Sequence, residues 1–431
     1  MTRLACRLLL VAVLTPLGVA AQSNYVPGDS WETVSPGALG WNEGALSDLI
    51  QWLGDEDSRA FLVLKDGRIA VEAYFHGHAR DDEWIWYSAG KSLTSVLVEM
   101  ARADGLISLD EPVSTYLGRW TGMSREREDS ILVRHNLTMT SGIDESVAFG
   151  CTLRICMPYR APAGTRWVYH NAPYNVLRPL LETVTGSDLG AFTNERLAGI
   201  GFSGRWDGVG DNNFFHSTAR TAARFGLLVS RFGRWGDEVV LDSASAQEML
   251  APSQDLNPSY GRLWWLNGQD AHILPGDTVQ TAGSIAPHAP RDVVTAAGSQ
   301  GQFISIAGSL NLVVVRMGRG DADLVPTHFL DELWMRLLAV TGTGTAVREW
   351  PSTPAVEVFP VPAGRFVEIR VPELPAAGIE VTDLLGRTTG VSGVLEAGRL
   401  RLDVSGLASG VYLLRLTGTT GPAAVRTIVV R

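Results

Sequence analysis

The chain has 431 residues, enough for about two to three domains. Its hydrophobic fraction of 45% and its 13 tryptophans are compatible with a large packed core. The formal net charge is −10 and no basic cluster interrupts the acidic balance, which argues against nucleic acid or an anionic membrane surface as a partner.

The first 21 residues predict a secretory signal peptide. Arg3 and Arg7 give a positive start, 8–19 is a short apolar run, and small residues precede Gln22 as a cleavage site. The apolar run is too short to span a bilayer, and no other long apolar stretch follows. We therefore expect an exported mature protein without stable membrane insertion.

Hydrophobic periodicity and turn residues predict the elements that follow the signal peptide. In chain order they are a helix over 43–53, a hairpin over 60–75, a helix ending at 104, a helix over 176–184, a helix over 218–228, a strand over 260–266, a strand over 296–306 paired with 310–317, and a helix over 329–340. Residues 341–355 are rich in Gly, Thr and Pro and predict a linker. Short alternating strands in 356–431 predict a small all-β sandwich.

The helix that ends near residue 104 carries the most informative pair. Ser88 and Lys91 are three residues apart at its start, so hydroxyl and amine share one helix face. Lys91 and Lys65 are the only lysines in the chain, and Lys65 lies in a hairpin turn. A lysine buried beside a hydroxyl can have its pKa lowered by desolvation and then accept a proton, which arginine cannot do near neutral pH. By itself this spacing is also common at solvated helix starts.

His135 is an alternative base, although its apolar helical surroundings favour a structural role.

The cysteines are few. Removal of the signal peptide takes away Cys6 and leaves Cys151 and Cys156, which are close enough in sequence to be a disulfide candidate in an oxidising compartment. A zinc site would need further ligands at matching spacing, and none are nearby. We expect no metal and no other cofactor.

Two further short motifs contain candidate site residues. Tyr169 and Asn171 point the same way in an extended chain and could both face a cleft, while the alternative is an edge aromatic and a helix cap. The glycine-punctuated segment that follows residue 296 permits close backbone approach, as an oxyanion site needs, or forms a plain bulge.

Taken together, these motifs resemble the serine β-lactamase and penicillin-binding-protein superfamily. The flanking residues 134–142, 217–220 and 260–265 are most similar to its class C-related esterase and 6-aminohexanoate-dimer-hydrolase-like branch. The resemblance implies an α+β protein with a β-lactamase/transpeptidase-like fold, an antiparallel sheet flanked by helices plus a helical subdomain, over residues 22–340. The three motifs, in chain order, are Ser88-Ala89-Gly90-Lys91, Tyr169-His170-Asn171 and Ser299-Gln300-Gly301-Gln302.

Carried over to this chain, the resemblance implies an acylated Ser88, with Lys91 as proton acceptor and Tyr169 as second base or relay. Asn171 would orient the substrate, and Gly301 would let the backbone N–H of Gln302 join that of Ser88 in an oxyanion hole.

The third motif usually opens with Lys or His, and Ser299 stands there instead. The resemblance therefore favours an ester or amide substrate without a carboxylate. The alternatives are a β-lactamase or D-alanyl-D-alanine carboxypeptidase, and a non-catalytic ligand-binding or sensor protein with the same cleft.

The tail resembles the C-terminal sorting module of the type IX secretion pathway through residues 359–362, 379–387 and 402–415. This resemblance implies a contact with the secretion machinery, and a route through the periplasm to the medium or the cell surface. A carbohydrate-binding sandwich is the alternative, but only three aromatic residues, at 359, 366 and 412, are available for it.

Overall fold

The computed structural model divides the chain into two compact units, Met1–Gly342 and Thr343–Arg431. It describes residues 25–147, 150–320 and 323–342 of the first unit and, in the second, the strands and some connecting residues of 357–430. The predicted signal peptide and residues 343–355 of the predicted linker lie outside the described residues.

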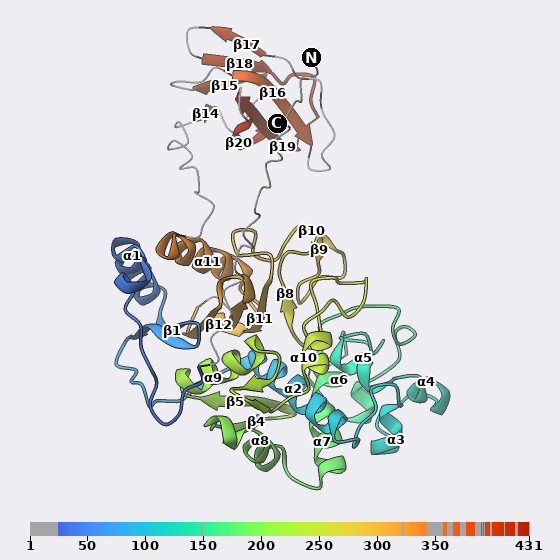
Figure 1. Cartoon of the computed structure of the whole chain (residues 1–431). Coiled ribbons are helices and arrows are strands. Elements are labelled where there is room, and N and C mark those ends of the chain that lie inside the picture. Colours follow the sequence, from blue (N-terminus) through green and yellow to red (C-terminus); the bar gives the residue numbers. More distant parts are fainter. Residues whose placement is uncertain are drawn as a thin grey trace, which may run out of the picture. The chain divides into compact units, whose positions relative to one another are not determined.

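A six-stranded antiparallel sheet forms the centre of the first unit, in the order β2-β1-β13-β12-β11-β8 (Figure 1). Its central strands are almost entirely buried, as expected of a sheet covered on both faces. The strands are β1 (Ser58–Lys65), β2 (Arg68–Tyr74), β8 (Trp265–Leu266), β11 (Val293–Gly298), β12 (Gln302–Ala307) and β13 (Leu312–Gly318).

Helices cover both faces of this sheet. On one face α1 (Glu43–Asp55) packs against α11 (Thr327–Thr341), and Phe329 of α11 lies 6.0 Å from Phe303 of β12, measured between ring centroids. On the other face α9 (Ala219–Ser230) lies so close that a Cβ added at Gly226 would be 3.0 Å from Ile304. Phe303 and Ile304 are neighbours on one strand, so they point to opposite faces.

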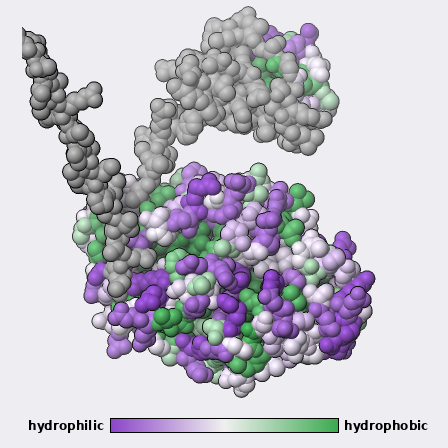
Figure 2. Space-filling model, turned by 45° about the vertical axis from the view of Figure 1, so that its right-hand side comes forward, coloured by the Kyte–Doolittle hydropathy of each residue, from purple (hydrophilic) through white to green (hydrophobic). Residues whose placement is uncertain are grey.

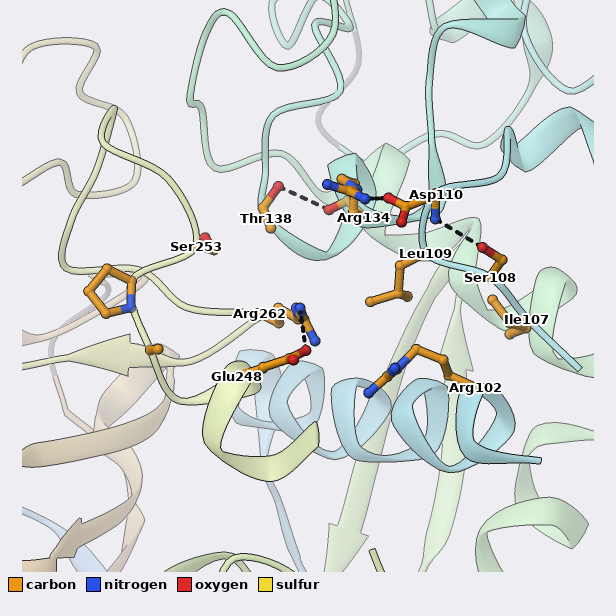
Figure 3. Close-up of a pocket in the computed structure, with 12 residues that line it drawn as sticks. Arg102, Ile107, Ser108, Leu109, Asp110, Arg134, Thr138, Glu248, Ser253 and Arg262 are labelled. Atoms are coloured by element: carbon orange, nitrogen blue, oxygen red, sulfur yellow. Dashed lines mark hydrogen bonds and ion pairs between the residues drawn. The ribbon is translucent and has the colours of Figure 1, made fainter. Parts of the chain in front are cut away.

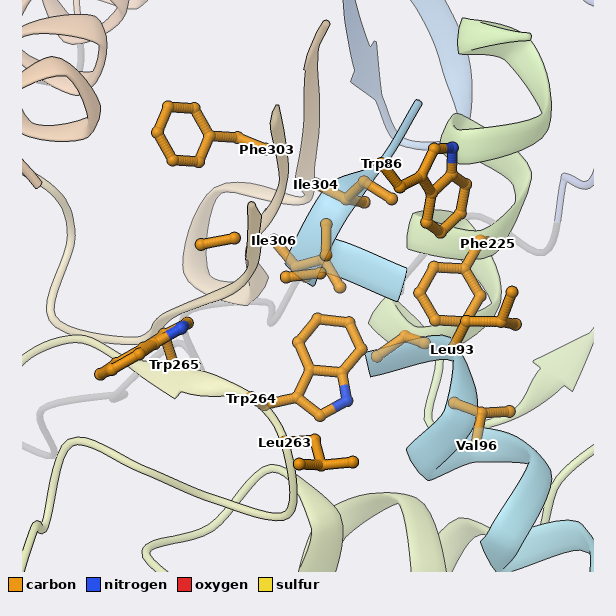
Figure 4. Packing of buried hydrophobic residues seen from close by; sticks show 14 of the residues in the cluster. Trp86, Leu93, Val96, Phe225, Leu263, Trp264, Trp265, Phe303, Ile304 and Ile306 are labelled. Atoms are coloured by element: carbon orange, nitrogen blue, oxygen red, sulfur yellow. The ribbon is translucent and has the colours of Figure 1, made fainter. Parts of the chain in front are cut away.

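Helix α2 (Gly90–Ala103) is the most buried helix of the unit, with twelve of its fourteen residues buried. Leu93 and Val96 face Trp264 and Phe225, whose rings stack at 5.9 Å (Figure 4). The helix ends at Ala103 with Asp104 as its C-cap, one residue before the predicted end. Its first turns are therefore packed against α9 and the residue that precedes β8.

The remaining elements of the unit form a helical cluster and small strand pairs around α2. They are α3 (Val113–Leu117), α4 (Arg125–Asp129), α5 (Val133–Leu137), α6 (Asn171–Asn175), α7 (Leu177–Thr185), α8 (Leu189–Leu197), α10 (Ser243–Met249), β3 (Trp84–Ile85), β4 (Arg205–Val209), β5 (Asn212–Ser217), β6 (Arg234–Trp235), β7 (Glu238–Val239), β9 (Ala271–His272) and β10 (Thr281–Ala282), with the 3₁₀ turns η1 (Gly37–Leu39), η2 (Tyr87–Ala89), η3 (Arg154–Cys156), η4 (Ala198–Ile200), η5 (Ser299–Gly301) and η6 (Gly308–Leu310). Figure 2 shows polar and apolar residues interspersed over the visible face of the unit.

The predicted α+β architecture is confirmed, with two local corrections. The single strand expected over 296–306 is two antiparallel strands, β11 and β12, because Gln300 (φ +61°) and Gly301 (φ +77°) reverse the chain between them. The strand expected over 260–266 is reduced to β8.

The second unit consists of two antiparallel sheets. One contains β14 (Glu357–Phe359), β15 (Phe366–Arg370), β18 (Arg399–Asp403) and β17 (Gly393–Glu396), and the other β16 (Ala376–Asp383), β19 (Gly410–Gly418) and β20 (Gly421–Val430). Val367 and Leu402 of the first sheet and Val381 of the second are buried, as in a small sandwich. In the described parts of both units, no helix combines the length and apolarity needed to cross a membrane.

Candidate active site

The turn η2 brings Ser88 to the beginning of α2. Tyr87, just before it, has φ +46°, an unusual conformation for a residue with a side chain. One helical turn later, Lys91 directs its amine back toward the turn, and Nζ donates a hydrogen bond to Ser88 Oγ at 3.1 Å. The predicted hydroxyl–amine pair is therefore formed.

Lys91 is buried, with 4% of its surface exposed. Its Nζ lies 5.2 Å from the ring centroid of Tyr169 and 4.4 Å from that of Tyr174. Burial removes water from the ammonium ion and lowers the pKa of Lys91 from 10.5 to about 7. A large fraction of this amine is therefore neutral near pH 7 and can accept a proton.

Tyr169 is also hydrogen-bonded to Ser88. Its ring stacks on Trp265 with 6.1 Å between centroids, and burial raises the pKa of its phenol above the usual value. Tyr174 hydrogen-bonds Thr94 at 3.1 Å, and burial raises its pKa to about 12. Both phenols therefore hold their protons at neutral pH.

Asn171 is the first residue of α6, two residues beyond Tyr169. Its Oδ1 is buried and has no hydrogen-bond partner in the described structure. The expected alternative, a helix-capping asparagine, does not apply, because the N-cap residue is His170 and no side-chain cap is formed. The Asn171 Oδ1 is thus a buried acceptor whose hydrogen-bonding capacity is unused.

The glycine that lies against the Ser88 turn is Gly298. A Cβ added at Gly298 would overlap the carbonyl oxygen of Trp86 and lie 3.1 Å from Ser88 N. A Cβ added at Gly301 would instead meet Arg316 Nη1 at 2.8 Å. The segment beside Ser88 is therefore shifted by three residues from the register that the third motif suggests.

The side chain of Gln302 is buried in the structure of this corner. Its Oε1 accepts from Gly318 N at 3.0 Å, and its Nε2 donates to the carbonyls of Gly318 at 2.6 Å and Ser299 at 3.1 Å. These bonds tie the η5 turn to the end of β13, and they leave the Gln302 side chain no role in contacting a substrate.

Cys151 and Cys156 are joined in a disulfide. The loop that contains them adjoins α6, because Asn175 Nδ2 donates to Gly150 O at 3.0 Å and to Asn212 Oδ1 at 3.1 Å. The disulfide therefore closes a loop beside the helix that begins at Asn171.

The alternative base, His135, has a structural role. Its Nδ1 accepts a hydrogen bond from Leu132 N at 3.1 Å at the start of α5, and burial lowers its pKa to about 4. Among the described residues, no group of three or more His, Cys, Asp or Glu is placed to hold a metal ion.

A cavity of about 530 Å³ lies at the other end of α2 and contains none of these candidates (Figure 3). Arg102 and Arg262 both donate to Glu99 at 2.6 Å, and Arg262 also reaches Glu248 at 3.1 Å. The charged groups of this cavity neutralise one another and join α2 to α10.

Sequence reasoning missed Tyr174, Trp265 and Gly298. Tyr174 follows Tyr169 by five residues, but nothing local indicates that both rings meet one lysine. Gly298 carries a detectable signal, since a glycine that ends an alternating strand favours close backbone approach. Choosing between Gly298 and Gly301 requires the contact with Trp86, more than 200 residues away in sequence.

An antiparallel sheet flanked by helices, with a serine–lysine turn at the start of a buried helix, defines a β-lactamase/transpeptidase-like hydrolase fold. Residues 48–318 match the Beta-lactamase family, and the chain belongs to this family. Residues 357–431 match the Secretion system C-terminal sorting domain.

Known proteins similar to the chain share little sequence with it. A proposed 6-aminohexanoate-dimer hydrolase from Bacillus anthracis is 17% identical, with a TM-score of 0.51, over 68% of this chain and 81% of that structure. EstCE1, a hydrolase with promiscuous acyltransferase activity, is 14% identical, with a TM-score of 0.54, over 71% of this chain and 99% of that structure. An uncharacterized protein from Alkalihalophilus pseudofirmus is 20% identical over 61% of this chain and 84% of its own length. The two solved structures support the fold.

Proposed function

We propose that the protein is an exported serine hydrolase that cleaves an ester or amide through an acyl-enzyme on Ser88. The observation that carries this proposal is the 3.1 Å hydrogen bond from Lys91 Nζ to Ser88 Oγ, made by a buried amine whose pKa is about 7. A serine hydroxyl becomes a nucleophile when an adjacent base can accept its proton.

In the acylation step, Ser88 Oγ attacks the substrate carbonyl carbon while Lys91 accepts the hydroxyl proton. Tyr169, a protonated phenol hydrogen-bonded to Ser88, relays a proton to the leaving group and is restored from Lys91. Water then attacks the acyl carbon by the reverse proton path and releases the acid. Asn171 orients the substrate through the amide whose oxygen has no protein partner.

The oxyanion hole consists of two backbone N–H groups, each contributing about 3 kcal/mol to transition-state stabilisation. Ser88 supplies one. The contact of Gly298 with the nucleophile turn favours Ser299, the next residue, as the second donor in place of Gln302.

The three-residue shift of the third motif, from Gly301 to Gly298, also bears on which substrate charge the site accepts. If Gly298 is the glycine of the third motif, the usual Lys or His position falls on Ala296, a fully buried apolar residue. No cation would then meet a substrate carboxylate, which supports a neutral ester or amide over a β-lactam or a D-alanyl peptide.

The proposal of export is supported by the predicted signal peptide and by the sorting domain at 357–431. The predicted signal peptide would carry the protein to the periplasm, and the sorting domain at 357–431 would contact the secretion machinery for transfer to the medium or cell surface. The Cys151–Cys156 disulfide fits an oxidising compartment.

The test of the hydrolase uses p-nitrophenyl butyrate, with intact-mass measurement of the acylated protein. We expect turnover and an adduct on Ser88, and at least a 10⁴-fold loss in Ser88→Ala, which keeps the fold because a small side chain replaces another. Preferred turnover of nitrocefin would identify a β-lactamase. A folded wild-type chain with neither turnover nor adduct would indicate a binding or sensor protein.

The test of export deletes 356–431. We expect the full chain to be secreted as a form that begins near Gln22 and lacks the tail, and the deleted form to remain active inside the cell envelope. Normal secretion of the deleted form would exclude a sorting function for the tail.

A further inference from the structure

Arg316 is a fully buried arginine in the middle of β13, between Phe61 of β1 and Phe303 of β12. Its guanidinium makes five hydrogen bonds, and none of the acceptors is a carboxylate. They are Ser58 Oγ at 3.0 Å, Gln300 O at 2.6 Å, Gly301 O at 3.2 Å, Glu56 O at 2.8 Å and Arg319 O at 2.6 Å.

A buried cation is energetically expensive, and neutral acceptors offset only part of that cost. Burial lowers the pKa of Arg316 to about 10, so the group is still charged at neutral pH. The fold therefore keeps a charged, five-donor group at a position where an apolar residue would pack more simply.

Two of the five bonds fix the η5 turn. They hold the carbonyls of Gln300 and Gly301, while Gln302 Nε2 holds the carbonyl of Ser299. Gln300 needs this support because its φ of +61° is unfavourable for a residue with a side chain. The turn begins directly after Gly298, the residue in contact with the Ser88 turn.

We propose that Arg316 is a positioning residue for the oxyanion hole. By holding the carbonyls of Gln300 and Gly301, the guanidinium fixes the η5 turn and thereby aims the backbone N–H of Ser299 at the position occupied by the substrate oxygen beside Ser88 N. Arg316 acts through the backbone and does not contact the substrate. This inference rests on the proposed function, since it requires an acyl-transfer reaction at Ser88.

A positioning role differs measurably from a purely structural one. Sulfur accepts hydrogen bonds more weakly than oxygen, so an oxyanion hole accelerates hydrolysis of an oxygen ester more than that of its thionoester. Damage to the hole lowers the oxygen-ester rate selectively. General loosening or partial unfolding lowers both rates by the same factor.

The experiment compares p-nitrophenyl butyrate with its thionoester in the full chain and in Arg316→Lys. Lysine keeps the charge, but one ammonium group cannot reach Gln300, Gly301, Glu56 and Arg319 together. We expect kcat for the oxygen ester to fall about 10- to 100-fold with KM changed less than about threefold, and the oxygen-to-thionoester rate ratio to fall about tenfold.

Arg224→Lys is the matched control. Arg224, on α9, also donates to backbone carbonyls, those of Pro27 at 3.0 Å, Ile200 at 2.9 Å and Gly28 at 2.6 Å, away from the nucleophile turn. We expect its oxygen-to-thionoester ratio to equal that of the wild type. An equal fall of the ratio in both variants would overturn the proposal.

Should Arg316→Lys fail to fold by circular dichroism, Ser58→Ala decides. This variant removes the acceptor that holds Arg316 Nε at 3.0 Å and leaves the backbone of the η5 turn unchanged. The same selective fall is expected. An unchanged ratio in a folded variant, with a wild type that forms the Ser88 adduct, overturns this inference alone. A wild type without adduct overturns the proposed function and this inference with it.

Discussion

The two lysines of the chain occupy opposite environments. Lys65 ends β1 beside a half-buried hairpin turn, with about a quarter of its side chain accessible and an ion pair to Asp66 at 2.7 Å. Lys91 is buried against a hydroxyl and two aromatic rings, and none of its described partners is a carboxylate. The residue type is the same, so the difference teaches that desolvation at the start of α2 lowers the pKa of Lys91 to about 7.

The sharpest way to break this comparison is to exchange each lysine for arginine. Lys91→Arg keeps the charge but cannot accept a proton near neutral pH, and we expect kcat/KM for a neutral ester to fall about 10³-fold. Lys65→Arg preserves an ion pair at the surface and should change the rate less than twofold. Comparable losses in the two variants, or an active Lys91→Arg enzyme, would contradict the assignment of the base.

The next effect concerns the phenol that meets Ser88. Tyr169→Phe keeps the ring stacked on Trp265 but removes the hydroxyl, and we expect about a 10²-fold loss in kcat from the missing proton relay. Tyr174→Phe is the comparison, because it keeps the ring near Lys91 and loses only the bond to Thr94. A loss in Tyr174→Phe as large as that in Tyr169→Phe would contradict the relay.

A third prediction follows the titration of Lys91. In the proposed mechanism the neutral amine is the active form, so kcat/KM should rise about tenfold per pH unit below a midpoint near pH 7 and level off above it. Two lysines give only two sets of ¹³Cε signals in selectively labelled protein, and Lys65→Arg identifies which belongs to Lys91. A Lys91 midpoint above pH 9 would refute the lowered pKa.

The last prediction concerns stability and not activity. The pKa of Lys91 is about 7 in the folded chain against 10.5 for the free side chain, so between these values the unfolded chain binds a proton that the folded chain does not. Folding is therefore penalised increasingly as pH falls from 10.5 to 7. Lys91→Met should raise the free energy of unfolding by a few kcal/mol at pH 7, less the lost bond to Ser88, and by much less at pH 10. Urea unfolding at both pH values measures this, and an equal gain at both would mean that desolvation is not the cause.

The sequence predicted correctly those features that depend only on residues close together in the chain. The helical spacing of the apolar residues Leu93, Val96 and Leu97 predicts α2. The three-residue separation of Ser88 and Lys91 is enough to predict their hydrogen bond. The break between β11 and β12 escaped prediction because Gln300, a residue with a side chain, takes a positive φ that only its tertiary hydrogen bonds support. The choice of Gly298 as the glycine beside Ser88 also could not be predicted, because it depends on a contact between segments that are distant in sequence.

The contact between Gly298 and the Ser88 turn joins backbone to backbone. The distance between strand and turn therefore depends on position 298 having no side chain, and not on the identity of neighbouring side chains that point away from the contact. A scaffold of this kind separates the part that performs chemistry from the part that selects what reacts. The backbone geometry at Ser88 can then be retained while the surrounding sequence changes, which suits a fold shared with structures of only 14–17% identity.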